Sequence, residues 1–240
     1  FHGSYNHNYH FLTMNDLYWE YDGNAKGNPN LKPEIGYSTE IGLSYDKKYT
    51  AFEHNLSATI FYSKIQDWIL WQYDFDENLN KLIWFPENLK NVERKGIEFS
   101  LENNYHLNGI QFINNINYQY VRAENKFEEN IIDQTKNKQL IYVPENLINA
   151  SLSILYKKYG LHFFYNFIDK RYTTSSNTDY LRAYQLFNVK VSRGFKFNQN
   201  LLDLQLGISN LTNEDYQVIS GRPMPRRIIS MTLKYRFLQK

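Results

Sequence analysis

The chain has 240 residues, a formal net charge of +2 and a mean hydropathy of -0.62. The near-neutral charge argues against a nucleic-acid-binding protein, the absence of cysteine excludes a disulfide framework, and no stretch reaches the roughly 18 apolar residues of a transmembrane helix. Aromatic residues make up 17% of the chain, which fits both the girdles of a membrane barrel and a tyrosine-rich soluble sandwich.

Ten segments alternate apolar and polar residues with a period of two, which is the pattern of β-strands. The first, from Gly3 to Phe11, is weakly patterned, whereas the second, from Ile35 to Tyr45, is regular. The remaining eight begin near Leu56, Ile97, Ile110, Ile148, Leu161, Phe187, Leu202 and Arg227. Most of them span roughly 10 to 15 residues, which is longer than a usual soluble strand. We expect no helix of convincing length.

Charged residues recur on the polar face of these segments. Glu98 and Glu102, for example, alternate with Ile97, Phe99 and Leu101. A water-filled lumen tolerates such carboxylates, whereas the dry interior of a sandwich would need a partner for each of them. A sandwich could also turn this face to water, so the pattern leaves both architectures open.

The connections between the strands are expected to alternate in length. Short turns are expected at 46–53, 106–109, 157–160 and 196–200, and long polar segments at 12–33, 70–90, 122–143, 173–181 and 211–226. Tight turns on one side and long loops on the other are typical of an outer-membrane barrel. Several long structureless loops would be unusual in a compact soluble domain.

Four short segments are distributed, in order, along nearly the whole chain: Thr13–Trp19, Asn28–Glu34, Val92–Glu98 and Gly207–Tyr216. Together they resemble the TonB-dependent outer-membrane receptors. The residues that carry this motif are Asn28, Pro29, Leu31, Lys32, Pro33, Glu34, Asn210, Leu211 and the terminal aromatic Phe237. The family usually stops on that aromatic residue, whereas Leu238, Gln239 and Lys240 follow it here.

The resemblance implies an all-β fold, namely a transmembrane antiparallel β-barrel. Residues 1–240 would form its C-terminal portion, the last ten or so of 22 strands, while the plug, the TonB box and the N-terminal strands would lie outside this chain. It further implies a receptor of the cell outer membrane, and not an enzyme. Such a receptor takes up vitamin B12, a ferric siderophore or haem with energy delivered through TonB.

The partners implied in this way are outer-membrane lipid and lipopolysaccharide, the small-molecule ligand, and TonB through the missing N-terminal part. No nucleic acid, cofactor or bound metal is implied. The segments Thr13–Trp19 and Asn28–Glu34 look closest to those of vitamin B12 receptors.

Aromatic residues beside polar groups suit the recognition of a small molecule. The candidate ligand-binding residues are Trp71, Tyr73, Trp84, Phe85, Tyr18 and Trp19. Trp68 and Trp71 also fit an interfacial girdle, and Pro29 and Pro33 fit a stiff loop without a ligand role.

Two further patterns have more ordinary interpretations. Asp74 and Asp76 imitate the opening of a calcium loop, but Leu79 stands where glycine is needed and Phe85 where glutamate is needed. The arginines near the last loop fit a lipopolysaccharide-facing patch or an anion site; they are Arg222, Arg226 and Arg227.

Two other classes of protein remain as alternatives. One is a soluble β-sandwich that binds glycans, which would pack one strand face into a dry core and fold without detergent. The other is a self-closed barrel of ten strands, such as an outer-membrane enzyme, although the sequence shows no recognisable nucleophile–base pair for it.

Overall fold

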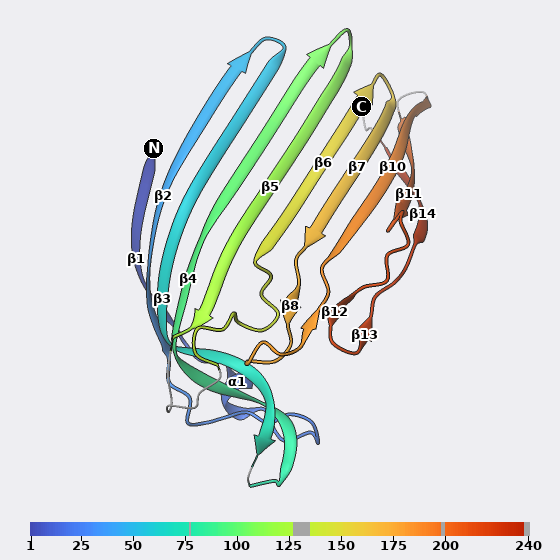
Figure 1. Cartoon of the computed structure of the whole chain (residues 1–240). Coiled ribbons are helices and arrows are strands. Elements are labelled where there is room, and N and C mark those ends of the chain that lie inside the picture. Colours follow the sequence, from blue (N-terminus) through green and yellow to red (C-terminus); the bar gives the residue numbers. More distant parts are fainter. Residues whose placement is uncertain (77, 127–134, 198–199, 238–240) are drawn as a thin grey trace.

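The computed structural model describes residues 1–76, 78–126, 135–197 and 200–237. A ten-stranded antiparallel sheet runs from one end of the chain to the other in the order β1-β2-β3-β4-β5-β6-β7-β10-β11-β14 (Figure 1). Two small two-stranded sheets, β8–β9 and β12–β13, lie in connections between its strands. The ten expected strands and their antiparallel arrangement are thereby confirmed.

The bounds of the elements show that four strands, β2 to β5, are longer than expected, with 16, 25, 27 and 16 residues. The large sheet contains β1 (His2–His10), β2 (Glu34–Tyr49), β3 (Phe52–Asp76), β4 (Lys81–Leu107), β5 (Ile110–Asn125), β6 (Asn146–Tyr156), β7 (Tyr159–Ile168), β10 (Tyr184–Phe197), β11 (Asn200–Ser209) and β14 (Ile228–Arg236). The other elements are α1 (Met14–Tyr18), β8 (Arg171–Tyr172), β9 (Tyr180–Leu181), β12 (Gln217–Ile219) and β13 (Arg222–Pro223). None of the described residues lies in an apolar helix of bilayer-spanning length.

The strand register is continuous across the large sheet. Ser57 lies opposite Ser100, Ser100 opposite Asn117, and Asn117 opposite Asn149, which in turn faces Asn166. Residues directly opposite each other share a face, so the alternation of one strand is passed to the next. A polar face and an apolar face therefore extend over the whole sheet.

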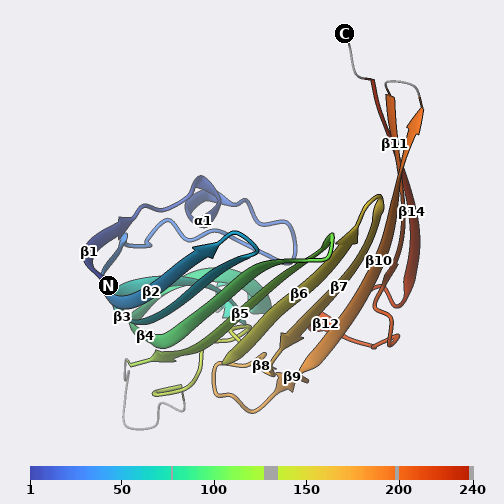
Figure 2. The same ribbon diagram turned by 90° about the horizontal axis from the view of Figure 1, so that it is seen from above.

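The sheet is curved and open, and Figure 2 shows it as a trough with α1 on its hollow side. Side chains of the polar face, including Ser57, Glu98, Asn117 and Asn149, line a hollow of the sheet. Glu98 accepts a hydrogen bond from the Gln119 amide at 2.9 Å. The carboxylates that were expected on this face thus lie on a wet, hollowed surface.

The apolar face is uncovered. Its residues include Ile60, Leu206 and Met231, which are 56%, 50% and 67% exposed. No second sheet packs on this face in the described part of the chain. Continuous exposed apolar surface of this extent indicates a non-aqueous neighbour, so the soluble β-sandwich alternative is wrong.

The prediction of a long loop at 70–90 is also wrong, because this segment forms a β-hairpin. β3 and β4 have 25 and 27 residues and stay in register up to the pair Asp76 and Lys81. A barrel strand crosses a bilayer with roughly 9–11 residues. The hairpin therefore projects far beyond its neighbours, and Figure 1 shows its end curving across the loop end of the sheet.

Smaller differences follow from the same lengthening of strands. The expected turn at 46–53 is reduced to Thr50 and Ala51, because β2 and β3 pair up to Tyr49 and Phe52. The expected loop at 122–143 begins later, since β5 continues to Asn125. Part of that loop, 127–134, lies outside the described residues, as do Leu238, Gln239 and Lys240.

Buried apolar side chains gather around the loop connections rather than under the sheet. Among the described residues they are Leu31, Ile83, Val92, Val121, Ala123, Leu140 and Tyr184. Val92, Ala123 and Leu140 form one cluster, against which Trp68 and Val143 pack. The loop end is consequently the part of the chain that has a packed protein interior.

The two faces of β11 provide a direct test of the expectation that the apolar side meets lipid. Lysine in place of Leu206, which faces outward between Val191 and Met231, should lower the free energy of unfolding in a bilayer by about 2–4 kcal/mol. Gln205→Lys, one residue away on the polar face, should change it by less than about 1 kcal/mol. Denaturant unfolding of the full-length protein in lipid vesicles measures both, and equal effects would contradict the assignment of faces.

Candidate functional site

The segment before β2 begins with a capped helix. The Thr13 hydroxyl accepts a hydrogen bond from the Asp16 amide at 3.1 Å, and the Asp16 carboxylate accepts one from the Thr13 amide at 3.1 Å, which forms a capping box. Asp16 also accepts a hydrogen bond from the indole N–H of Trp71 at 2.9 Å. Burial opposes ionisation of Asp16, but the hydrogen bonds from Thr13 and Trp71 outweigh it and lower its pKa. The helix is thus anchored to β3.

Residues 24–26, which follow α1, pair through backbone hydrogen bonds with the edge of the β3–β4 hairpin. The Trp84 amide donates to the Asn24 carbonyl at 2.7 Å, and the Lys26 amide donates to the Trp84 carbonyl at 3.0 Å. Ala25 forms a parallel bridge with Trp84. This stretch therefore lies beside β4 as a short third strand of the hairpin.

The motif residues fasten the same segment further along. The Asn28 side chain donates to the Pro86 carbonyl at 3.1 Å, and the Lys32 amide donates to the Asn88 side chain at 2.8 Å. Glu34 accepts a hydrogen bond from the Ile69 amide at 2.9 Å. Leu31 is buried between these contacts, while Pro29 and Pro33 contribute no amide donor. These observations favour a stiff structural loop over a direct ligand role for the motif.

The second part of the motif has a similar role. Asn210 is buried with a φ of 52°, a backbone conformation that asparagine tolerates better than most residues. Its side chain accepts from the Glu214 amide at 2.7 Å and donates to the Glu214 carbonyl at 2.8 Å. The next amide, of Leu211, donates to the Phe187 carbonyl at 2.7 Å. Phe237 follows β14 and is exposed beside Tyr235, with ring centroids 4.7 Å apart.

Among the candidate ligand-binding residues, the structure brings Tyr73 and Trp84 together. They lie directly opposite each other on β3 and β4, with ring centroids 5.5 Å apart, and are 56% and 36% exposed. Trp71 shares their strand face, two residues from Tyr73. Phe85 is next to Trp84 in β4 and faces the other way, half-buried. Tyr73, Trp84 and Trp71 thus form one aromatic strip on the hairpin.

Tyr18 and Trp19 lie at the end of α1 and are both exposed. The Trp19 indole donates to the Asp22 carboxylate at 3.3 Å. A further pair that sequence reasoning missed lies beside them, since the Lys81 ammonium donates to the Tyr21 hydroxyl at 3.3 Å and to the Gly23 carbonyl at 3.0 Å. The sequence offers no signal for this contact, because it joins residues about sixty positions apart.

Trp68 and Trp71 do not form an interfacial girdle. Trp68 packs against the cluster of Val92, Ala123 and Leu140, and Trp71 donates to Asp16. Both rings are engaged by protein groups at the loop end, because β3 continues past the ends of the shorter strands of the sheet. The girdle interpretation of these two residues is therefore corrected.

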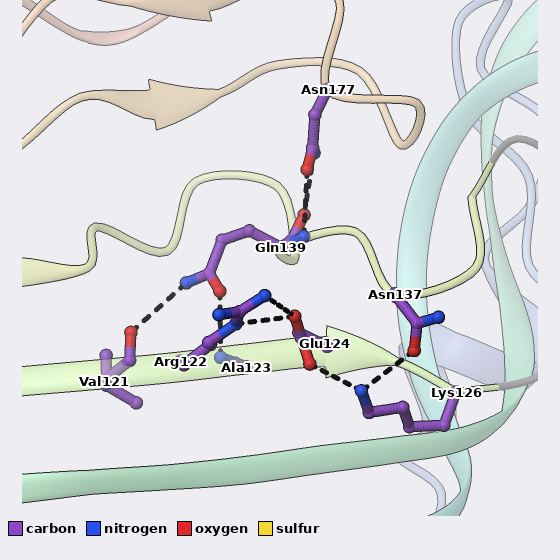
Figure 3. A network of polar contacts seen from close by, with 8 residues as sticks. All are labelled: Val121, Arg122, Ala123, Glu124, Lys126, Asn137, Gln139 and Asn177. Carbon is purple, nitrogen blue, oxygen red and sulfur yellow. Dashed lines mark hydrogen bonds and ion pairs between the residues drawn. The ribbon is translucent and has the colours of Figure 1, made fainter.

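The hairpin also contacts the connection between β7 and β10. The Gln72 side chain accepts a hydrogen bond from the Ser175 hydroxyl at 3.1 Å. In the same connection, Asn177 accepts from the Gln139 amide at 2.9 Å and donates to the Gln139 carbonyl at 2.8 Å (Figure 3). The Gln139 side chain in turn accepts from the Ala123 amide at 2.9 Å. Three connections are thereby linked around β5.

A buried carboxylate stabilises the end of β5 and the connection that leads from it to β6. Glu124, whose side chain is 6% exposed, accepts from Arg122 Nε and Lys126 Nζ, each at 2.6 Å, and Lys126 also donates to Asn137 at 2.9 Å (Figure 3). Burial by itself would raise the pKa of Glu124, but the hydrogen bonds and charges of Lys126 and Arg122 lower it below the ordinary value. Glu124 therefore stays ionised and ties both ends of this connection together.

Arg171 links the connection between β7 and β10 to the connection between β11 and β14. It is 4% exposed and donates to the carbonyls of Gln217 at 3.0 Å and Val218 at 3.3 Å. Its guanidinium lies 5.0 Å from the centre of the Tyr184 ring, which packs against Tyr216 with ring centroids 4.5 Å apart. Contacts between connections consequently run from α1 to β12.

The remaining candidate residues have partners within their own loops. Asp76 accepts hydrogen bonds from the amides of Asn78 at 2.8 Å and Leu79 at 3.0 Å, so its carboxylate caps the hairpin turn. Arg226 pairs with Asp215 at 2.8 Å, and Arg227 donates to the Leu211 carbonyl at 2.7 Å. Arg222 lies in β13. These contacts give Asp76, Arg226 and Arg227 structural roles.

Comparison with known proteins identifies the sheet. The family model described as "TonB dependent receptor-like, beta-barrel" matches residues 1–211. The vitamin B12 transporter BtuB of Photobacterium profundum is 28% identical over 229 residues, which is 94% of this chain and 33% of the relative. BtuB of Vibrio vulnificus is 24% identical over 205 residues, 85% of this chain and 29% of the relative. The chain thus spans about a third of these curated relatives.

Solved structures show the same fold. The copper transporter OprC superposes with a TM-score of 0.70 at 16% identity, covering 98% of this chain and 37% of OprC. A mutant of the ferric enterobactin receptor PfeA from Pseudomonas aeruginosa superposes with a TM-score of 0.63 at 18% identity, covering 96% of this chain and 37% of PfeA. At these identities the similarity concerns the fold alone.

Because Glu124 forms ion pairs with Arg122 and Lys126, a single substitution at Glu124 should destabilise the connection after β5. Glu124→Gln should speed hydrogen exchange of the Lys126 and Asn137 amides, which donate to Asn91 and Asn125, about tenfold or more. The reason is that hydrogen bonds to a charged group contribute roughly 1.5–3 kcal/mol. Glu20→Gln, at an exposed carboxylate, is the control and should leave these amides unchanged.

The same group predicts the pH dependence of this connection. Because the folded pKa of Glu124 lies below its ordinary value of 4.5, its stabilisation is complete above pH 4.5 and is lost as the pH falls through the lower folded pKa. Protection of these two amides in the native protein should therefore decline in acid, once the intrinsic exchange rate is corrected for. The Glu124→Gln variant should show no such decline, and an identical decline in both proteins would contradict the role of Glu124.

Proposed function

This chain belongs to the TonB dependent receptor-like β-barrel family, and from that premise we propose that residues 1–240 are the C-terminal ten strands of a larger receptor barrel in the outer membrane. The coverage of about a third of the BtuB relatives supports this assignment. So does the shape of the sheet, which is an open trough whose outermost strands are β1 and β14. Unpaired sheet edges are where a larger barrel would continue.

The uncovered apolar face carries the proposal of a membrane location. Apolar side chains such as Ile97 and Leu233 point away from the hollow of the sheet and remain exposed, which suits contact with lipid and would be costly in water. The tight turns would then face the periplasm and the long connections the outside. We propose that the whole receptor is a transporter rather than an enzyme, and that energy reaches it through TonB by way of parts outside this chain.

The proposed ligand is a scarce nutrient bound at the loop end. Vitamin B12 comes first, because the two curated relatives are vitamin B12 transporters, and ferric siderophores and haem are the other members of the class. Tyr73 and Trp84 of the aromatic strip offer exposed rings beside polar groups, as small-molecule sites do, and the half-buried Trp71 adjoins them. Tyr18 and Trp19 would extend this surface, and Phe85 would support it from the opposite strand face.

Removal of the exposed ring pair tests the ligand site. In the full-length receptor, Tyr73→Ala combined with Trp84→Ala should weaken binding of cyanocobalamin at least tenfold, because an aromatic contact at the centre of an interface contributes more than about 1 kcal/mol. Tyr105→Ala, at an exposed aromatic residue near the opposite, turn end, should leave affinity unchanged. Calorimetric titration with cyanocobalamin, haemin and a ferric siderophore measures both effects.

The outcomes of that titration separate the parts of the proposal. Binding of a ferric siderophore or haemin instead of cyanocobalamin would retain the receptor and correct its ligand. Binding that survives loss of both rings would overturn the site. A full-length protein that is monomeric and fully structured in plain buffer, without detergent, would overturn the membrane receptor itself.

A further inference from the structure

The turn end of β6, β7 and β10 carries cations that lie on aromatic rings. The Lys157 ammonium lies 5.0 Å from the centre of the Tyr156 ring. The Arg193 guanidinium lies 5.0 Å from the centre of the Tyr159 ring and 4.7 Å from that of Phe195. Separations of this size are those of cation–π contacts.

The strand register makes these groups into one surface patch. Tyr156 lies opposite Tyr159, and Tyr159 lies opposite Arg193, so three neighbouring strands present them on the same face. That face is the apolar one, and Tyr156, Tyr159 and Arg193 are exposed on it, while Lys157 is exposed in the adjoining turn. We call Tyr156, Lys157, Tyr159, Arg193 and Phe195 the cation–aromatic patch.

The patch has no acidic counterpart. Residues 151–168 and 184–202 contain no aspartate or glutamate, whereas they contain Lys157, Lys158, Lys190, Arg193 and Lys196. The next carboxylate along the chain, that of Asp203, lies opposite Gly194 on the polar face and pairs with Arg236 at 2.8 Å. The charges of Lys157 and Arg193 are therefore available to an anion that approaches the outer face.

An apolar strip begins directly beside the patch. Ile154, Leu161 and Val191 form the adjacent row across the three strands, and Leu152 and Phe163 belong to the row after that. Val191, Phe163 and Leu152 are 49%, 40% and 37% exposed. A molecule that fits both parts has an anionic head and hydrocarbon chains.

We propose that the cation–aromatic patch binds the phosphate headgroup of an anionic glycerophospholipid in the leaflet that faces the turns, with its acyl chains along the apolar strip. The inference rests on the proposed membrane barrel. A similar contact at the turn end of β2, where Lys47 lies 5.3 Å from the centre of the Tyr49 ring, places a further cation at the corresponding end of another strand. Basic residues near an anionic membrane surface attract its lipids, and the rings hold these cations at the headgroup level.

Lipid binding to the full-length protein tests this proposal. The protein is purified in detergent and titrated with short-chain phosphatidylglycerol, and the bound lipid is counted by native mass spectrometry. The variant that combines Lys157→Gln with Arg193→Gln should bind phosphatidylglycerol about thirtyfold more weakly, because each of the two cations near the surface contributes about 1 kcal/mol. Lys138→Gln removes one positive charge from an exposed position at the loop end, and this variant should bind as the native protein does.

Phosphatidylcholine provides the second comparison, because its headgroup has the same phosphate and no net charge. The native protein should prefer phosphatidylglycerol, and the double variant should lose that preference. Equal affinity of the native protein for both lipids, or an equal loss in the Lys138→Gln variant, would overturn the site while leaving the barrel and its transport role intact. A protein that needs no detergent would instead overturn the proposed function on which the site rests.

Discussion

The continuous antiparallel register is the constraint on which the other features depend. Backbone N–H and C=O groups of a single-layer sheet must be satisfied by neighbouring strands, because lipid offers them no partner. From β1 to β14 the ladder continues without a described shift, so residues such as Ser57, Ser100 and Asn117 stay on one face. A slip of one residue between two strands would send lysine and glutamate to the apolar side.

This arrangement separates two kinds of stability within one chain. The trough has little protein interior of its own, and its apolar side chains face away from its hollow. The loop end, in contrast, is packed around Val92, Ala123 and Leu140 and is tied by Glu124 and Arg171. The stability of the trough depends on the surrounding medium, while that of the loop end comes from ordinary buried contacts. The proposed recognition surface at the loop end can therefore be rigid, although the sheet that supports it has little protein interior.

Alternation along the sequence predicted the ten strands and their two faces, because the period of two is a local property that each strand displays by itself. It also contained a signal that was overlooked, since Trp71, Tyr73 and Phe75 alternate with Gln72 as strand residues do. Their polar neighbours and the length of the segment favoured a loop, and only the pairing with β4 decides otherwise.

The contacts that build the candidate site could not be predicted in this way. The hydrogen bond between Asp16 and Trp71 and that between Gln72 and Ser175 join residues 55 and 103 positions apart. Neither has a spacing that a sequence pattern could reveal, because each depends on where the curved hairpin ends. The motif residues were recognisable from their resemblance to a family, but the roles of Asn28 and Lys32 as anchors to β4 became clear only from the fold.

The contacts of the β3–β4 hairpin bear on how such a receptor changes its specificity. Asn24, Asp16 and Ser175 belong to two different connections, and each of these connections is hydrogen-bonded to the hairpin. Grafting one connection from a homologue would leave its former hydrogen-bonding partners on the hairpin without a matching donor or acceptor. Chimaeric receptors, and natural divergence, should therefore exchange these outer segments as sets.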